Sequence, residues 1–333
     1  IVSAKSVVSE VSGPSGMKMA GPYEYVSPSY WYDPQAPGGA LGFNTETGIG
    51  AQLPVRESLE KMLGGQLLPI DNRWDALCTA STSAMNSLTK LTEVINARFG
   101  QSTDIDAFLH RADLLNYEST RAMFEAFRLN EPRSTGIIQW MLNAARPSIY
   151  WQLYDYYGQP NAAYYAVKHG NESIQLIYDY RHRTVCAVNE TRVPATIKAS
   201  MRLIGGTDDY RDTLLTIVPG DVVKVFDIDS SQSSAFLLLK TSDTNDRLMA
   251  SNDYYIPVER DEYDWQKGDW VTTPITRYAD YSDLDTLPKA VCEFSTRHIE
   301  GGSGLCYEVT IHNTSPVVAF FIRLAAKDAD DSL

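Results

Sequence analysis

The sequence predicts a multidomain protein in which an α/β part is followed by all-β parts. The chain has 333 residues, more than one ordinary domain needs. Strand-like and helix-like patterns alternate up to about residue 170, and short strands separated by turn residues follow up to residue 260. Hydrophobic residues make up 44% and charged residues 21% of the chain, as in ordinary folded domains.

Residues 1–170 are expected to form the C-terminal part of a (β/α)8 TIM barrel. The expected elements are a strand over 40–45, helices over 54–63, 75–98 and 105–129, a strand over 136–142 and a helix over 161–169. The run GIIQWML at 136–142 is nearly all apolar, which is typical of a parallel strand buried on both faces. Only about two and a half β/α units are present, whereas a closed barrel needs eight strands.

The rest of the chain is expected to contain immunoglobulin-like β-sandwich domains. Seven strands are expected over 173–180, 184–189, 195–203, 213–217, 221–226, 235–240 and 247–250, and this spacing predicts a sandwich over 171–260. Residues 261–286 are charged, aromatic and poor in strands, which predicts a linker. Residues 287–333 hold three more expected strands, over 290–295, 305–312 and 317–324. Three strands predict an incomplete second sandwich.

Charge and cysteine usage exclude several classes of protein. The net charge is −13 and no basic stripe is present, so a nucleic-acid partner is not expected. No apolar run approaches ~18 residues, so no membrane-spanning helix is expected. The four cysteines form no CxxC pair and the five histidines are scattered, so neither a metal site nor a cofactor is expected. Cys292 and Cys306 fall in neighbouring expected strands, either disulfide-bonded or as free buried thiols.

Glu46 is the candidate catalytic residue. It stands where the strand in ALGFNTETG (40–48) ends and a glycine-rich turn begins, and the carboxyl ends of strands form the active site of a TIM barrel. A carboxylate there can attack an anomeric carbon when a second carboxyl group protonates the leaving oxygen. Alternatively, Glu46 caps a helix or forms an ion pair. Asn44 faces the same side of the strand and either orients Glu46 or faces the barrel interior.

An aromatic loop precedes this strand. Residues 12–39 are rich in Gly, Pro, Ser and Tyr, and a loop of this length is usually functional or disordered. Its aromatic residues favour an ordered loop over a site. Tyr23 and Trp31 are therefore candidate walls of a substrate pocket, with ordinary packing as the alternative.

Several motifs resemble one branch of glycoside hydrolase family 2. They are MKMAGPYEYV (17–26), YWY (30–32), GGALGFNTET (38–47), TGIIQWMLN (135–143), WQLYDYY (151–157), NTS (313–315) and AFFIRL (319–324). The branch contains the exo-β-D-glucosaminidases and the related mannosylglycoprotein endo-β-mannosidases. The motifs occur in order and are spread over most of the chain.

The resemblance implies a retaining glycosidase with Glu46 as its nucleophile, at the end of the seventh barrel strand. It also implies that Trp140, on the eighth strand, is the aromatic floor of the sugar subsite. Asn143, which closes that strand, either bonds a sugar hydroxyl or serves the turn. The acid/base of the family is the Glu of an Asn-Glu pair after the fourth strand. The pairs at 130–131, 171–172 and 189–190 are wrongly placed, so the acid/base is expected upstream of residue 1.

The implied activity is hydrolysis of terminal β-D-glucosaminide bonds in chitosan-type oligosaccharides. The alternatives are a β-mannosidase, exo or endo, and a non-catalytic carbohydrate-binding or bracing module. The expected partners are the oligosaccharide and the missing N-terminal part of the same enzyme. The acidic charge suits a polycationic substrate, although it also keeps a protein in solution. The family-level expectation for location is periplasmic or extracellular, because the polymer lies outside the cell.

Overall fold

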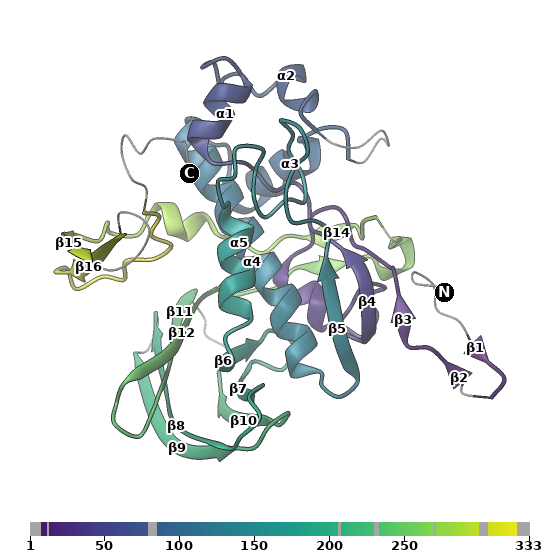
Figure 1. Ribbon diagram of the computed structural model, residues 1–333. Helices are drawn as coiled ribbons and strands as arrows, with labels where there is room; N and C mark the ends of the chain where they lie inside the picture. The colour runs from purple at the N-terminus through teal and green to yellow at the C-terminus, as the bar shows by residue number, and fades with distance from the viewer. Residues whose placement is uncertain are drawn as a thin grey trace. The chain divides into compact units, whose positions relative to one another are not determined.

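The computed structural model describes residues 8–11, 13–78, 85–205, 208–229, 233–269, 271–299 and 306–324 (Figure 1). The chain divides into two compact units, Ile1–Tyr281 and Ser282–Leu333. Within the described ranges, no helix is long and apolar enough to cross a membrane.

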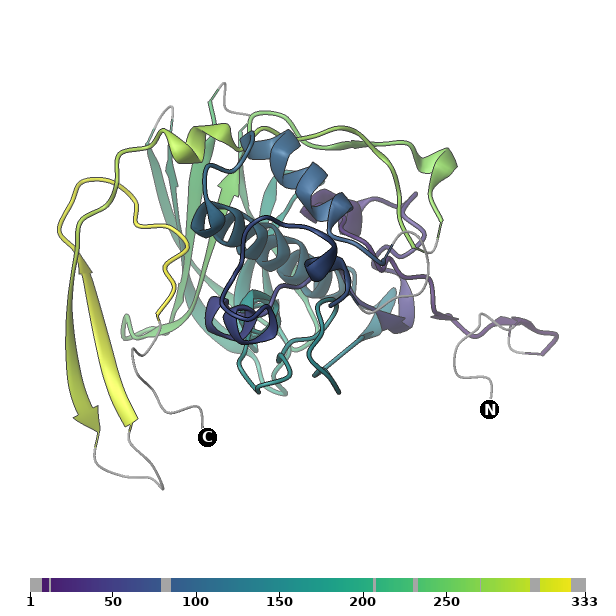
Figure 2. The same cartoon turned by 90° about the horizontal axis from the view of Figure 1, so that it is seen from above.

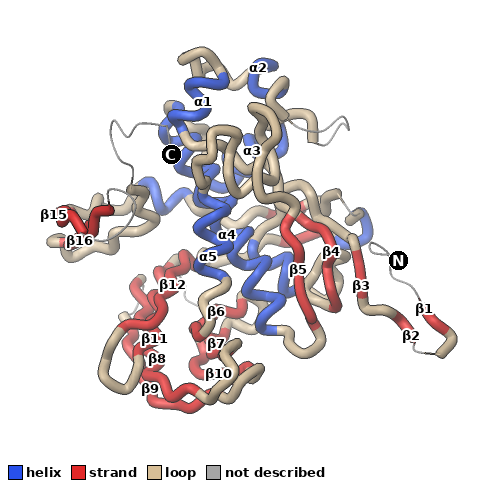
Figure 3. Tube along the Cα trace, viewed as in Figure 1, coloured by secondary structure: helices blue, strands red, loops and turns tan. Residues whose placement is uncertain are grey.

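A three-stranded parallel sheet carries the N-terminal part of the first unit. Its order is β3 (Met17–Lys18), β4 (Gly42–Thr47) and β5 (Ser134–Gln139), drawn side by side in Figure 3. Both β3 with β4 and β4 with β5 are parallel, and Asn44 pairs with Ile137 of β5. The short strands β1 (Val8–Ser9) and β2 (Gly13–Pro14) form a separate antiparallel pair. The two strands expected near residues 40 and 136 are therefore present, and they are parallel neighbours.

Helices connect and flank these strands. They are η1 (Pro28–Tyr32), α1 (Arg56–Met62), α2 (Asn72–Asp75), α3 (Thr89–Phe99), α4 (Ile105–Leu129) and α5 (Ala162–Gly170). Helix α4 has the expected bounds, and the Asp104 carboxylate caps it by accepting from the backbone N–H of Ala107 at 2.8 Å. Asn161 caps α5 in the same way. Helices α4 and α5 run side by side (Figure 1).

The prediction of a continuous helix over 75–98 is wrong. Helix α2 ends at Asp75 and α3 begins at Thr89, and residues 79–84 between them lie outside the described residues. The Ser87 hydroxyl accepts a hydrogen bond from the backbone N–H of Thr89 and donates one to the Thr89 hydroxyl. Such local hydrogen bonds offer the backbone an alternative to a helix, so the apolar periodicity alone was misleading.

The seven strands expected after residue 170 are all present. They are β6 (Ile174–Asp179), β7 (Thr184–Asn189), β8 (Ala195–Ile204), β9 (Asp209–Ile217), β10 (Val222–Asp227), β11 (Ala235–Ser242) and β12 (Leu248–Ile256). They form two antiparallel sheets, of order β10-β7-β6 and β12-β11-β8-β9. Four strands against three is the division expected of an immunoglobulin-like sandwich.

Helix α4 is fastened to the sandwich by buried polar groups. The Arg121 guanidinium donates to the carbonyl of Asp253 at 2.7 Å, and the Glu125 carboxylate accepts from Asn252 and Tyr254, each at 2.9 Å. Arg121 and Glu125 also form an ion pair on the helix. Removing one member of this set would leave the other charge buried and unpaired, which is strongly destabilising. The contacts therefore hold the helix against the sandwich.

Residues 261–269 and 271–281 are packed, which corrects the expectation of a linker over 261–286. They contain β13 (Glu262–Tyr263), η2 (Trp265–Lys267) and β14 (Ile275–Arg277). The Asp261 carboxylate pairs with buried Arg98 at 2.7 Å, and the Arg98 carbonyl accepts from the backbone N–H of Tyr281 at 2.9 Å. The backbone N–H of Tyr23 donates to the Val271 carbonyl at 2.9 Å. Asp261, one of the charges on which the linker prediction rested, therefore pairs with the α/β part.

The second unit contains η3 (Ser282–Asp285) and a long hairpin, β15 (Cys292–Ile299) with β16 (Cys306–Asn313), seen in yellow tones in Figure 2. The third strand expected over 317–324 is absent from this described segment. Cys292 pairs with Asn313 and Cys306 with Ile299, so the thiols lie at opposite ends of the hairpin. Both are free and exposed, so the expected alternatives, a disulfide or buried thiols, are both wrong.

Candidate active site

The parallel sheet positions Glu46 near the carboxyl end of β4. The strand begins at Gly42, whose φ of +66° brings it against the carbonyl of Gly16. A Cβ at residue 42 would lie 2.1 Å from that oxygen, so glycine is required there. Thr47 pairs with Gln139 of β5 and marks the end of β4. Glu46 therefore lies at the carboxyl ends of the parallel strands, where parallel α/β folds place their active sites.

Tyr23 is the hydrogen-bond partner of Glu46. Its hydroxyl donates to Glu46 Oε1 at 2.7 Å. Burial, followed by the bond to Glu46, raises the pKa of Tyr23, so the phenol keeps its proton and acts as a donor. A donor fixed on one oxygen restricts the rotation of the Glu46 carboxylate.

Trp151 holds Tyr23 in place. Its indole Nε1 donates to the Tyr23 carbonyl at 2.7 Å, and the two rings meet edge to face at 5.8 Å between centroids. The backbone carbonyl of Trp151 accepts from Met141 N–H at 3.2 Å and from Gln139 Nε2 at 3.0 Å. Trp151 therefore links Tyr23, the hydrogen-bond partner of Glu46, to the end of β5. Sequence reasoning did not single out Trp151, although it opens the WQLYDYY motif.

Trp140 follows β5 and is 42% exposed. Its backbone N–H donates to the Thr47 carbonyl at 2.7 Å. Its own carbonyl lies so close to Gly48 that a Cβ there would approach to 1.8 Å. The ends of β4 and β5 are thus locked together, and the indole keeps a solvent-exposed surface. Asn143 is exposed, and its backbone pairs with Tyr154.

Asn44 is fully buried and acts on the backbone of Glu46. Its Oδ1 accepts from the Glu46 N–H at 3.3 Å and its Nδ2 donates to the Gly21 carbonyl at 3.3 Å.

The prediction that Trp31 forms a wall of a substrate pocket is wrong. Trp31 is 1% exposed and packs edge to face against Tyr30 in η1. A buried indole offers no face to a sugar, so Trp31 belongs to the aromatic core and not to a pocket wall.

Glu24, the neighbour of Tyr23, has a different environment from Glu46. It is buried and accepts a hydrogen bond from the Tyr150 hydroxyl. Burial raises the pKa of Glu24 to about 7, against the bonds and charges around it. Tyr150 in turn packs edge to face on Trp151, with 4.7 Å between ring centroids. Glu24 thus supports the aromatic set behind Tyr23.

None of the three Asn-Glu pairs lies at the carboxyl end of the described parallel strands. Asn130 ends α4 and precedes β5, so Glu131 is at the opposite end of the sheet from Glu46. Asn171 ends α5. Glu190 follows β7 and pairs with Arg128. Nor does the described part of the chain hold a group of His, Cys, Asp and Glu residues that could bind a metal ion.

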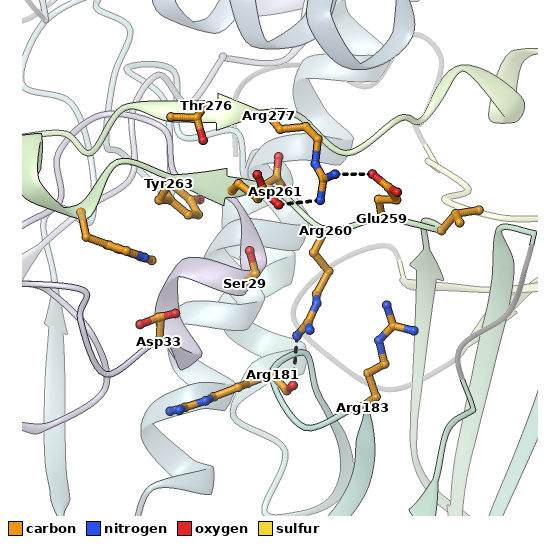
Figure 4. A pocket seen from close by; sticks show the side chains of 13 residues that line it. Ser29, Asp33, Arg181, Arg183, Glu259, Arg260, Asp261, Tyr263, Thr276 and Arg277 are labelled. Atoms are coloured by element: carbon orange, nitrogen blue, oxygen red, sulfur yellow. Dashed lines mark hydrogen bonds and ion pairs between the residues drawn. The ribbon is translucent and has the colours of Figure 1, made fainter.

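A hollow of about 860 Å³ lies elsewhere in the first unit (Figure 4). It is lined by Ser29 of η1, by Asp33 just after η1, by Arg181 and Arg183 of the turn between β6 and β7, and by residues 258–263, 265, 276 and 277. Neither Glu46 nor Trp140 lines it. The hollow is therefore distinct from the candidate site that Glu46 defines at the carboxyl end of β4.

The fold defines a multidomain protein, α/β followed by antiparallel β-sheets, as expected from the sequence. Comparison with known proteins places this fold in a family context. The family model described as exo-beta-D-glucosaminidase Ig-fold domain matches residues 270–333. The chain is 33% identical to the exo-beta-D-glucosaminidase of Arthroderma benhamiae, covering 98% of this chain and 38% of that protein. It is 31% identical to that of Amycolatopsis orientalis, covering 99% and 34%.

Solved structures show the same relationship. The exo-chitosanase CsxA of Amycolatopsis orientalis superposes with a TM-score of 0.86 and 29% identity, covering 94% of this chain and 39% of that one. Two variants of CsxA, one with an aspartate and one with a glutamate replaced by alanine, are known in complex with PNP-beta-D-glucosamine. The Beta-D-Mannosidase of Dictyoglomus thermophilum, at 19% identity and a TM-score of 0.63, shares the fold. The chain is thus a homologue of the exo-β-D-glucosaminidases and spans 34–38% of the length of the relatives named above.

Proposed function

We propose that this chain supplies the nucleophile half of a retaining exo-β-D-glucosaminidase. The observation that carries the proposal is Glu46 at the carboxyl end of a parallel strand, with one oxygen bonded to Tyr23. The names of the relatives support glucosaminide as the bond that is cleaved.

The parallel sheet supports placing these strands in a (β/α)8 barrel. Strand β4 is the seventh strand and β5 the eighth in this proposal. Ile138 and Leu142, in and after β5, are exposed in the described residues, as expected of residues that other parts of a barrel would cover. Residues 171–260 and 287–333 remain proposed immunoglobulin-like domains, of which the second overlaps the matched family model.

The proposed reaction has two steps. Glu46 Oε2 attacks the anomeric carbon, the bond to the leaving oxygen breaks, and an acid from outside these 333 residues protonates that oxygen. A water molecule, deprotonated by the same residue, then attacks the anomeric carbon and releases Glu46. Tyr23 holds Oε1 throughout. Trp140 offers an exposed indole for the apolar face of the sugar ring, and Asn143 is a candidate hydrogen-bond partner for a hydroxyl group.

The acid/base is proposed to lie upstream, because no Asn-Glu pair of the described residues is suitably placed. We also propose a periplasmic or extracellular location, since a polymeric substrate lies outside the cell.

The test is hydrolysis of an aryl β-glucosaminide and an aryl β-mannoside by the complete protein that contains this chain. We expect the glucosaminide to be cleaved and a Glu46→Gln variant to be inactive. Preference for the mannoside would keep the mechanism and change the substrate. Failure to cleave either would favour a binding or bracing module.

A further inference from the structure

Strands β13 and β14 form an antiparallel hairpin, and Val271, near its tip, contacts the loop that carries Tyr23. The backbone N–H groups of Tyr23 and Glu24 both donate to the Val271 carbonyl, at 2.9 and 3.0 Å. One carbonyl oxygen can accept both bonds because it has two lone pairs. A segment that follows the sandwich in the sequence therefore bonds the backbone of the residue whose side chain bonds Glu46.

Asp269 fixes the turn that contains Val271. Its Oδ1 accepts from the backbone N–H groups of Val271 and Thr272, each at 2.8 Å. Its own backbone N–H donates to the Thr272 carbonyl at 2.9 Å. An aspartate that bonds the backbone two and three residues ahead is a common way of holding a turn. The carboxylate thus holds Val271 in the conformation that presents its carbonyl to Tyr23 and Glu24.

The base of the hairpin is fastened separately from its tip. The Tyr263 hydroxyl accepts from the backbone N–H of Ser27 at 2.8 Å and lies 2.6 Å from the Ser27 hydroxyl oxygen. Asp261 pairs with buried Arg98. Asp269 itself is exposed. A substitution of Asp269 therefore loosens the tip and leaves the buried contacts of the base in place.

The backbone of Tyr23 is also held on its carbonyl side. That carbonyl accepts from the backbone N–H of Gly50 at 3.0 Å and from the indole Nε1 of Trp151 at 2.7 Å. The Val271 carbonyl holds the N–H side. Both peptide groups of Tyr23 are thus bonded, and together they set the direction of the side chain whose hydroxyl meets Glu46. Displacement of a group by about 1 Å can cost up to 100-fold in rate, so these backbone bonds bear on the reaction.

We propose that Asp269 is a positioning residue for the reaction of Glu46. It acts through the Val271 carbonyl and the backbone of Tyr23, and it does not touch the sugar. This role rests on the proposed function, because it assigns to the hairpin the task of keeping the Tyr23 hydroxyl on the Glu46 carboxylate. The segment beyond the sandwich thereby becomes part of the support of the candidate site.

The first test is amide hydrogen exchange of the complete protein, measured by mass spectrometry at the peptide that contains Tyr23 and Glu24. Asp269→Ala should speed exchange of these two amides about fivefold or more, because their bonds to Val271 open more easily. Asp269→Asn should exchange as the wild type does, because its side-chain oxygen still accepts both N–H groups. The matched control is Asp264→Ala, since the Asp264 carboxylate belongs to the same hairpin and bonds Lys267. Unchanged exchange in Asp269→Ala would overturn the proposal.

The second test is steady-state kinetics on an aryl β-glucosaminide. Asp269→Ala should lower kcat by about three- to tenfold and leave KM nearly unchanged, because the reacting carboxylate and not the sugar contacts are disturbed. Asp269→Asn should restore kcat, and Asp269→Ala should have little further effect when Tyr23→Phe is already present. The same loss in both backgrounds, or no recovery with asparagine, would overturn the positioning role. A wild type that cleaves no glucosaminide would instead contradict the proposed function, whereas the exchange measurement detects failure of the link to Tyr23 without any substrate.

Discussion

The hydroxyl of Tyr23, in the loop before β4, donates a 2.7 Å hydrogen bond to Oε1 of Glu46 in β4. This bond connects the aromatic loop to the candidate nucleophile. In the proposed mechanism, it fixes one carboxylate oxygen of Glu46 and leaves the other oxygen to attack the sugar.

Removing this hydroxyl should slow the enzyme without unfolding it. In Tyr23→Phe the ring and its packing on Trp151 remain, and only the bond to Glu46 is lost. A hydrogen bond to a charged group contributes about 1.5–3 kcal/mol, so kcat/KM should fall by roughly 10- to 100-fold. Steady-state kinetics of the complete protein on an aryl β-glucosaminide measures this. An unchanged kcat/KM would show that Tyr23 has no part in positioning Glu46.

Trp151 should act through Tyr23. Trp151→Phe keeps an aromatic ring but removes the indole N–H that bonds the Tyr23 carbonyl. We expect a decrease in kcat/KM of about tenfold. The further decrease should be much smaller when Tyr23→Phe is already present, because both changes act through the hydrogen bond between Tyr23 and Glu46. A double-mutant cycle measures this coupling, with Trp74→Phe as the matched control on another buried indole. Additive effects of Trp151→Phe and Tyr23→Phe would contradict the claim that Trp151 acts through Tyr23.

Glu24 should make stability depend on pH. Its pKa is raised from an ordinary value of 4.5 to about 7, so the folded state holds a proton that the unfolded state loses first. Stability therefore falls as pH rises from about 4.5 through 7, by on the order of 3 kcal/mol. Glu24→Gln cannot ionise and still offers Tyr150 an acceptor. Its Tm relative to the wild type should be higher at pH 8 than at pH 5. The same difference at both pH values would contradict this origin.

The 333-residue chain alone should be inactive. The outer edges of β3 and β5 have no strand neighbour among the described residues, and the acid/base is proposed to lie upstream. Loss of leaving-group protonation costs about two to four orders of magnitude in rate. Side-by-side assays of the isolated chain and the complete protein measure this difference. Turnover by the isolated chain at the rate of the complete protein would show that the catalytic groups are all within it.

Local sequence patterns predicted most of the elements but few of the contacts between them. Helix α4 and the strands of the sandwich follow from periodicity and turn residues, which depend on near neighbours in the chain. The bond between Tyr23 and Glu46 joins a loop to a strand, and no periodicity encodes it. Glu46 and Trp140 became candidates through their motifs, whereas Trp151 was not singled out because its contacts with Tyr23 depend on the fold.

Two errors have a common cause. Residues 261–286 were interpreted as a linker because they are charged, aromatic and poor in strands, yet Asp261 pairs with Arg98, a partner that lies far away in the sequence. The segment 317–324 was expected to be a strand from its apolar run, yet its described residues pair with no strand. In both cases long-range pairing, which composition does not reveal, decided the structure.

The central claim is that Glu46 forms the covalent bond to the sugar. The most direct measurement is mass spectrometry of the complete protein after incubation with a slow, fluorinated aryl β-glucosaminide. We predict that the peptide containing Glu46 gains the mass of one glycosyl group, and that Glu46→Gln gains none. A glycosyl group on another residue, or an active enzyme that forms no such adduct, would contradict the account.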